Sequence, residues 1–152
     1  MRRPDELTRA FRAQGLKITP QRQLLFTLLH DNETHPTAEA LYTVAHAQMP
    51  GISRRTVYQT LTDLVSMGEL SSLAVGGGAT RFDPNTAAHH HALCDECGAL
   101  LDIYVDDLQF RAQGLEGFAA SGATIVFNGR CATCVPNDLP NNPVINNKEH
   151  QQ

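Results

Sequence analysis

The four cysteines of the chain form two Cys-x-x-Cys pairs, Cys94/Cys97 and Cys131/Cys134. Tetrahedral zinc is satisfied by four thiolates, and a two-residue spacer lets the sulfurs of each pair reach one ion. In a reducing compartment zinc ligation is favoured over a disulfide or a thiol redox pair, which stay as alternatives. The long interval between the pairs predicts a structural zinc site that joins a hairpin to a distant C-terminal segment.

A second set of chemically active residues begins with the run His89-His90-His91. Alternate residues of a strand face the same side, so His89 and His91 would project together and His90 away from them. Pro36 favours an extended conformation for the preceding His35. The candidate ligands, three imidazoles and two carboxylates, are His35, Asp83, His89, His91 and Asp102. Such a nitrogen and oxygen site suits Fe(II), Mn(II) or Zn(II), whereas a histidine run is otherwise an exposed polar segment.

Composition and charge narrow the class of protein. The 152 residues carry a formal charge of −4. Residues 1–75 hold eight Lys and Arg against seven acids, and the remainder holds four against nine. The N-terminal half can therefore present a basic face, while the acidity belongs to the C-terminal half. No apolar run suggests a membrane span and no signal peptide is apparent, so we expect a cytoplasmic protein without a membrane partner.

Capping residues and apolar spacing predict four helices in the N-terminal half. The first runs from Pro4 to Gln14, and the others follow the capping residues Thr19, Thr37 and Ser53. Two short strands over residues 70–75 and 80–84 form a hairpin behind them. This order is typical of a winged helix-turn-helix, with a generic helical domain as the alternative.

The C-terminal half has a different pattern. Strands are predicted over residues 91–94, 99–104 and 123–127, with a helix over 106–118. The polar tail is expected to be disordered. The predicted fold class is α+β: a winged-helix DNA-binding domain (1–83), a small α/β metal-binding dimerisation domain (84–135) and a tail (136–152).

The start of the fourth helix carries the candidate DNA-reading residues. Arg54 and Arg55 can reach phosphates or guanine edges, and Tyr58 and Gln59 lie one turn further. Lys17 and Arg22 add positive charge for phosphate contacts. The alternative is that Tyr58 packs against the domain and the arginines are only solvated.

Several segments in this order resemble the ferric uptake regulator (Fur) family of metal-dependent bacterial repressors. They are residues 17–22 (KITPQR), 35–38 (HPTA), 56–58 (TVY), 81–83 (RFD) and 89–98 (HHHALCDECG). The resemblance implies a homodimer that binds a palindromic operator in double-stranded DNA. It also implies structural Zn²⁺ on the four cysteines and a regulatory Fe²⁺ or Mn²⁺ on the five His and Asp residues.

Aspartate at both position 83 and position 102 is most like the peroxide-sensing branch of that family, PerR. In that branch Fe(II) reacts with hydrogen peroxide and oxygen is added to a ligand histidine, here His35 or His89. The alternative is an iron- or zinc-uptake regulator in which metal occupancy is the signal. A third metal site of some relatives looks incomplete, because residues 121–130 hold no histidine. An enzyme is not expected, since no His-Glu-x-x-His pattern occurs and five protein ligands leave little room for substrate.

Overall fold

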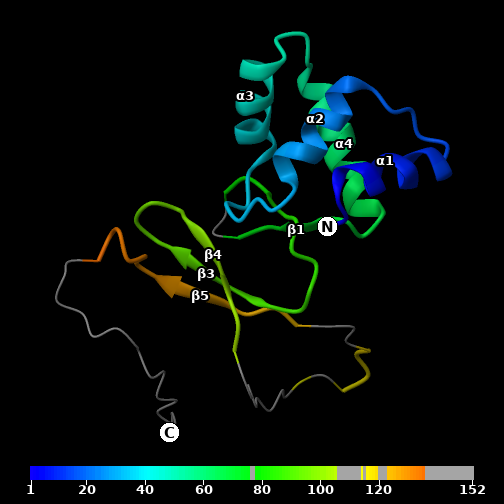
Figure 1. The fold of residues 1–152 in the computed structure, drawn as a ribbon. Coiled ribbons are helices and arrows are strands. Elements are labelled where there is room, and N and C mark those ends of the chain that lie inside the picture. The colour runs from blue at the N-terminus through cyan, green and yellow to red at the C-terminus, as the bar shows by residue number, and fades with distance from the viewer. Residues whose placement is uncertain (76–77, 106–113, 115, 120–122, 136–152) are drawn as a thin grey trace, which may run out of the picture.

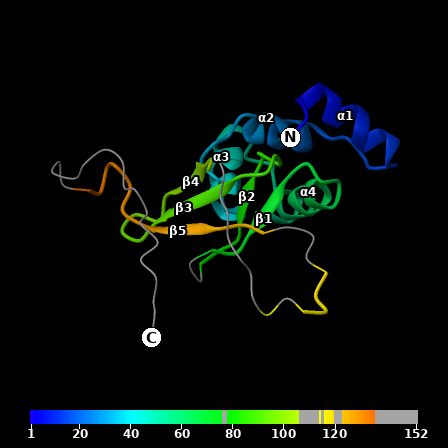
Figure 2. The same cartoon turned by 90° about the horizontal axis from the view of Figure 1, so that it is seen from below.

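The structure is a computed structural model that describes residues 1–75, 78–105, 114, 116–119 and 123–135. Four helices come first along the chain, followed by a two-stranded and then a three-stranded sheet. In both views the two-stranded sheet lies between the helices and the three-stranded sheet (Figure 1, Figure 2). The predicted α+β class is confirmed.

The helices begin where the capping residues predict. The four are α1 (Pro4–Ala13), α2 (Pro20–Leu29), α3 (Ala38–Gln48) and α4 (Arg54–Ser66). The side chains of Thr19, Thr37 and Ser53 each accept a hydrogen bond from the backbone N–H three residues later. Such a cap satisfies one of the amide groups that a helix start leaves free. Beyond α1, Gly15 adopts a φ of +72°, which an L side chain rarely takes, and the helix ends there.

The hydrophobic core is formed by buried side chains from one face of each of the four helices. Its buried members are Leu7, Phe11, Leu25, Phe26, Leu29, Ala38, Leu41, Ala45, Ile52, Val57, Leu61, Leu64 and Leu70. The rings of Phe11 and Phe26 meet edge to face with centroids 4.8 Å apart. In α2 the side chains of Leu25, Phe26 and Leu29 are buried, whereas Leu24 and Leu28 only border the core. The core is formed by contacts between helices that leave Arg54 and Arg55, at the start of α4, exposed.

The two-stranded sheet is the wing. Strands β1 (Ser71–Leu73) and β2 (Arg81–Asp83) are antiparallel, with Ser71 opposite Asp83. Both strands are shorter than the sequence predicts. Because the hairpin follows α3 and α4, the arrangement is the predicted winged helix-turn-helix.

The three-stranded sheet has the order β4-β3-β5. Its strands are β3 (His90–Cys94), β4 (Leu100–Ile103) and β5 (Val126–Gly129). β4 is antiparallel to β3, and β5 is parallel to it. The helix predicted over 106–118 falls mostly outside the described residues, as does the predicted tail. In the part of the chain that the structure describes, no helix is long and apolar enough to cross a membrane.

Candidate metal centre

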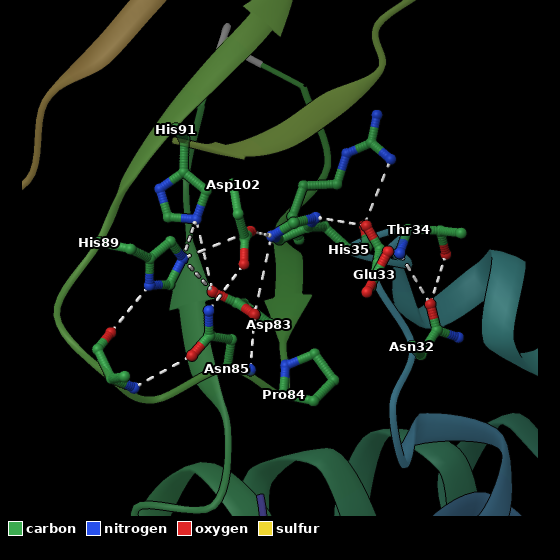
Figure 3. Close-up of polar contacts among 12 residues, drawn as sticks. Asn32, Glu33, Thr34, His35, Asp83, Pro84, Asn85, His89, His91 and Asp102 are labelled. Atoms are coloured by element: carbon green, nitrogen blue, oxygen red, sulfur yellow. Dashed lines mark hydrogen bonds and ion pairs between the residues drawn. The ribbon is translucent and has the colours of Figure 1, made fainter. Parts of the chain in front are cut away.

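Five side chains from three parts of the chain converge where the wing meets the three-stranded sheet. Figure 3 shows the imidazoles and carboxylates of His35, Asp83, His89, His91 and Asp102 pointing toward one another. One ligand atom from each lies within 4.8 Å of all the others. The structure therefore brings together the whole set that the sequence singled out.

The positions of four of the five clustered side chains follow from the strands that carry them. His89 and His91 alternate along β3 and its entry, and their ring centroids lie 4.5 Å apart. In the antiparallel ladder His91 is the partner of Asp102, so the carboxylate arrives beside the imidazoles. Asp83 ends β2, and its Oδ2 lies 3.0 Å from Nε2 of His89. The period-two alternation and the strand register thus gather two histidines and two aspartates.

His35 comes from the loop between α2 and α3. Its φ is +48°, in the left-handed region, so the extended conformation expected from Pro36 is wrong. The turn aims the imidazole at the sheet, with Nε2 2.7 Å from Oδ1 of Asp102. Arg81 supports the turn from the other side: its guanidinium donates to the carbonyl of His35 at 3.4 Å and to that of Gly98 at 2.9 Å. Non-glycine residues in this backbone region cluster at functional sites, where the surrounding contacts hold them.

Backbone carbonyls define the tautomer of two histidines. Nδ1 of His35 lies 3.1 Å from the carbonyl of Glu33, and Nδ1 of His89 lies 2.8 Å from that of Ala87. A carbonyl only accepts, so in both rings Nδ1 carries the hydrogen and donates. The Nε2 lone pairs are then free to face the centre. Metal-binding histidines are commonly oriented in this way.

The five clustered side chains are better suited to bind a cation than to form hydrogen bonds with one another. Among the residues that the structure describes, Nε2 of His35 and Oδ1 of Asp102 are buried and have no hydrogen-bond partner, although the two atoms lie 2.7 Å apart. Burial, followed by the charge of His89, lowers the pKa of His91, which keeps that imidazole neutral and able to ligate. Two carboxylates gathered in one cluster bring negative charge that a divalent ion would balance. The donor set suits Fe(II), Mn(II) or Zn(II).

Asn85 is the residue near the centre that sequence reasoning missed. Its backbone N–H donates to Oδ1 of Asp83 at 2.7 Å, and its side-chain amide donates to Oδ2 of Asp102 at 2.7 Å. Burial opposes the ionisation of Asp102, but the bond from Asn85 and the nearby imidazoles prevail, and the pKa of Asp102 is lowered. The available signal was an asparagine two residues after an aspartate, a position that favours side-chain to backbone bonds in turns.

The cysteines form a separate cluster at the far end of β3. Sγ atoms of Cys94, Cys97, Cys131 and Cys134 all lie within 4.8 Å of one another, and all four thiols are free. The backbone amides of Cys97 and then Cys131 lower the pKa of the Cys94 thiol to about 6, and the amide of Cys134 lowers that of Cys131. Thiolates bind zinc, so both shifts favour ligation by Cys94 and Cys131, whereas hydrogen bonding to the sulfurs of Cys131 and then Cys97 raises the pKa of the Cys134 thiol. Gly98, at a φ of +70°, makes the turn after Cys97.

The candidate DNA-reading residues lie on two parts of the helical surface. Lys17, Arg22, Arg55 and Gln59 line one shallow hollow between the starts of α2 and α4. Arg54 and Tyr58 lie beside α3, where Arg54 Nε is 3.0 Å from Glu39 and the Tyr58 hydroxyl donates to Glu39 at 3.4 Å. Tyr58 is 49% exposed, which disfavours the packing alternative.

Arg22 also has a structural partner. Its guanidinium lies 2.6 Å from Oδ2 of Asp63, with both side chains mostly buried, and it stacks over the Phe11 ring at 5.3 Å. We expect Arg22→Met to lower the free energy of unfolding by about 3–5 kcal/mol, because it leaves the Asp63 charge buried and unpaired. Urea unfolding followed by circular dichroism measures this change.

Two controls distinguish the loss of the Arg22–Asp63 ion pair from a general effect of substitution on stability. Arg55→Met, at an exposed position of α4, is expected to change stability little. The double variant Arg22→Met/Asp63→Leu is expected to be more stable than Arg22→Met alone, since no buried charge remains. Equal stability of the two Arg22 variants would count against a buried ion pair.

Together the fold and the two clusters define a class: a winged-helix protein with a candidate metal centre between its helical part and a small sheet. The chain belongs to the ferric uptake regulator family, whose sequence pattern matches residues 13–126. It is 32% identical over 133 residues to the peroxide-responsive repressor PerR of Staphylococcus epidermidis, covering 86% of this chain and 89% of the relative. The PerR of Staphylococcus aureus matches equally, over 90% of its length.

Solved structures of the family share the fold. The ferric uptake regulator of Helicobacter pylori aligns with a TM-score of 0.67 and 18% identity, covering 91% of this chain and 100% of that one. PerR from Streptococcus pyogenes aligns with a TM-score of 0.52 and 24% identity, covering 89% and 95%. The family predicted from the sequence is confirmed.

Proposed function

We propose that this protein is a metal-dependent transcriptional repressor that binds operator DNA as a homodimer in the cytoplasm. Support comes from its membership of the family and from curated relatives at 32% identity that are peroxide-responsive repressors. The basic side chains at the starts of α2 and α4 supply a surface for phosphates and base edges. Two such surfaces in a dimer would match a palindromic operator. The relatives are regulators, so no enzymatic role is proposed.

In this proposal the two clusters have different tasks. Cys94, Cys97, Cys131 and Cys134 hold structural zinc, and the five His and Asp side chains hold a regulatory Fe²⁺ or Mn²⁺. The observation that carries the proposal is the convergence of His35, from the loop before α3, with ligands of both sheets within 4.8 Å. Metal binding would join the helical part to the three-stranded sheet. Because the ion stabilises only the joined arrangement, its binding energy would favour the DNA-binding state.

The finer part of the proposal is that peroxide is the signal. Bound Fe(II) would supply the redox chemistry, and hydrogen peroxide would convert a ring C–H of His35 or His89 to an oxidised carbon bearing oxygen, with water released. An oxidised imidazole is a poor ligand, so the joined arrangement and the DNA complex would be lost. Aspartate at both carboxylate positions and the PerR relatives favour this signal. The alternative is an iron- or zinc-uptake regulator in which metal occupancy is the signal.

Peptide mass spectrometry after brief exposure to peroxide tests the signal. We expect the peptides that contain His35 or His89 to gain the mass of one oxygen atom in Fe(II)-loaded protein. Mn(II)-loaded protein, which lacks the redox chemistry, should stay unmodified. The peptide that contains His46, on the exposed face of α3, is the internal control. Unmodified His35 and His89 in the iron sample would favour the metal-uptake alternative.

A further inference from the structure

The two carboxylates of the candidate centre use their oxygen atoms unequally. In Asp83, Oδ2 faces the imidazoles, 3.0 Å from Nε2 of His89 and 3.4 Å from Nε2 of His91. Its other oxygen, Oδ1, accepts the backbone N–H of Asn85 at 2.7 Å and is 3.7 Å from Nε2 of His35. Oδ1 of Asp83 is thus engaged by Asn85, although it also borders the imidazole of His35.

Asp102 repeats this division through the side chain of the same asparagine. Its Oδ1 is buried, has no hydrogen-bond partner within the described part of the chain, and lies 2.7 Å from Nε2 of His35 and 3.4 Å from Nε2 of His89. Its Oδ2 accepts from Nδ2 of Asn85 at 2.7 Å, and the Tyr104 hydroxyl donates to the same oxygen over the longer distance of 3.5 Å. A single residue therefore holds one oxygen of each aspartate, as the labelled side chains in Figure 3 show.

The Asn85 side chain is itself fixed in this orientation. Its Oδ1 accepts the backbone N–H of Ala87 at 3.2 Å, which identifies the opposite atom, Nδ2, as the donor. The second hydrogen on Nδ2 is directed to the Tyr104 hydroxyl at 2.8 Å. All hydrogen-bonding capacity of Nδ2 is used, so rotation of the amide would break three contacts. Asn85 is built to hold the carboxylates and not to ligate a metal.

We propose that Asn85 is a positioning residue that restricts each aspartate to one metal-facing oxygen. This inference rests on the proposed regulatory metal site. With three imidazole nitrogens and two carboxylate oxygens, the chain would supply five donor atoms to the ion, and a position would stay available for a small oxygen or nitrogen ligand such as water, peroxide or azide. A carboxylate released from Asn85 can present both oxygens and close that position. Metal sites depend on such supporting hydrogen bonds as well as on the ligands.

Cobalt(II) is a suitable probe, because the intensity of its visible bands falls on going from five to six ligands. The protein is first loaded with zinc at the cysteines and then with cobalt, and azide is added. We expect the wild type to show the stronger five-coordinate bands and a spectral shift with azide. In Asn85→Ala, which removes the donor to Asp102 and keeps the backbone bond to Asp83, we expect weak bands and loss of the azide shift.

A second variant and a matched control keep the result interpretable. Asn85→Asp preserves the shape of the side chain and the acceptor for Ala87 but cannot donate, so it should also lose the azide shift. Asn128→Ala removes an exposed amide on β5 and should behave as the wild type. Wild-type band intensity and azide response in both Asn85 variants would overturn the role of Asn85. Variants that bind no cobalt would also overturn it, since Asn85 would then be needed for metal binding itself and not only to limit the carboxylates. A wild type that binds no cobalt would instead overturn the proposed metal site.

Discussion

Withdrawal of zinc from the cysteine cluster is expected to unfold the three-stranded sheet while most of the helical signal remains. Cys94 is the last residue of β3, and Cys131 follows β5 by two residues, so the cluster joins the ends of two paired strands. The described part of this sheet buries few apolar side chains, chiefly Cys94 and Leu100. Structural zinc in small domains contributes roughly 10–16 kcal/mol of apparent binding free energy. Packing of so small a sheet cannot replace that contribution.

Circular dichroism, gel filtration and metal analysis during titration with a chelator measure this effect. The α-helical signal should persist because the buried core of α1 to α4 contains no cysteine. Re-addition of zinc is the control for damage by the chelator and should restore the sheet. An unchanged spectrum with an intact dimer in zinc-free protein would contradict a structural role for the cluster.

Loss of the His89 imidazole is expected to abolish the increase in DNA affinity that Mn(II) causes in the wild type. His89 Nε2 contacts the carboxylates of both Asp83 and Asp102, so its removal opens the centre on the side of β3. Couplings between two binding sites typically correspond to about 5–150-fold in affinity. We expect a coupling in this range for the wild type and none for His89→Ala. Fluorescence anisotropy with a labelled duplex, selected from a random pool by the Mn(II)-loaded protein, measures both affinities.

His90→Ala is the matched control, one position along the same strand. Nδ1 of His90 accepts from the backbone N–H of Ile125, away from the five clustered side chains. This variant should keep most of the response to Mn(II). Equal DNA affinity of metal-free and Mn(II)-loaded wild type would contradict the proposed mechanism, and an equal loss in both variants would place the effect outside the centre.

The spacing of residues within short segments was sufficient to predict several features of the fold and of the two clusters. The caps Thr19, Thr37 and Ser53 act on amides three residues away, so the starts of α2, α3 and α4 were correctly predicted. The alternation of His89 and His91 and the two-residue spacers of the cysteine pairs are equally local. The boundaries of the strands were less accurate, since pairing with a distant partner decides where a strand ends.

Other features depend on packing between distant segments. Arg22 was predicted as a phosphate contact, and only the packing of α2 on α4 revealed its buried pair with Asp63. His35 was expected to be extended, but the contacts of its imidazole and carbonyl hold a positive φ. Phe26 is buried in the core, where its ring packs against Phe11 of α1.

The sequence by itself determined the residue types of both clusters, the helix starts and the winged-helix order, because each depends on residues close together in the chain. The tertiary structure decided which atoms of those residues face one another. The assignment of one oxygen of each aspartate to Asn85 and the other to the imidazoles requires β2, β4 and the loop before β3 to meet. Hydrogen-bond geometry is sensitive to shifts of a fraction of an ångström, so only the packed chain specifies it.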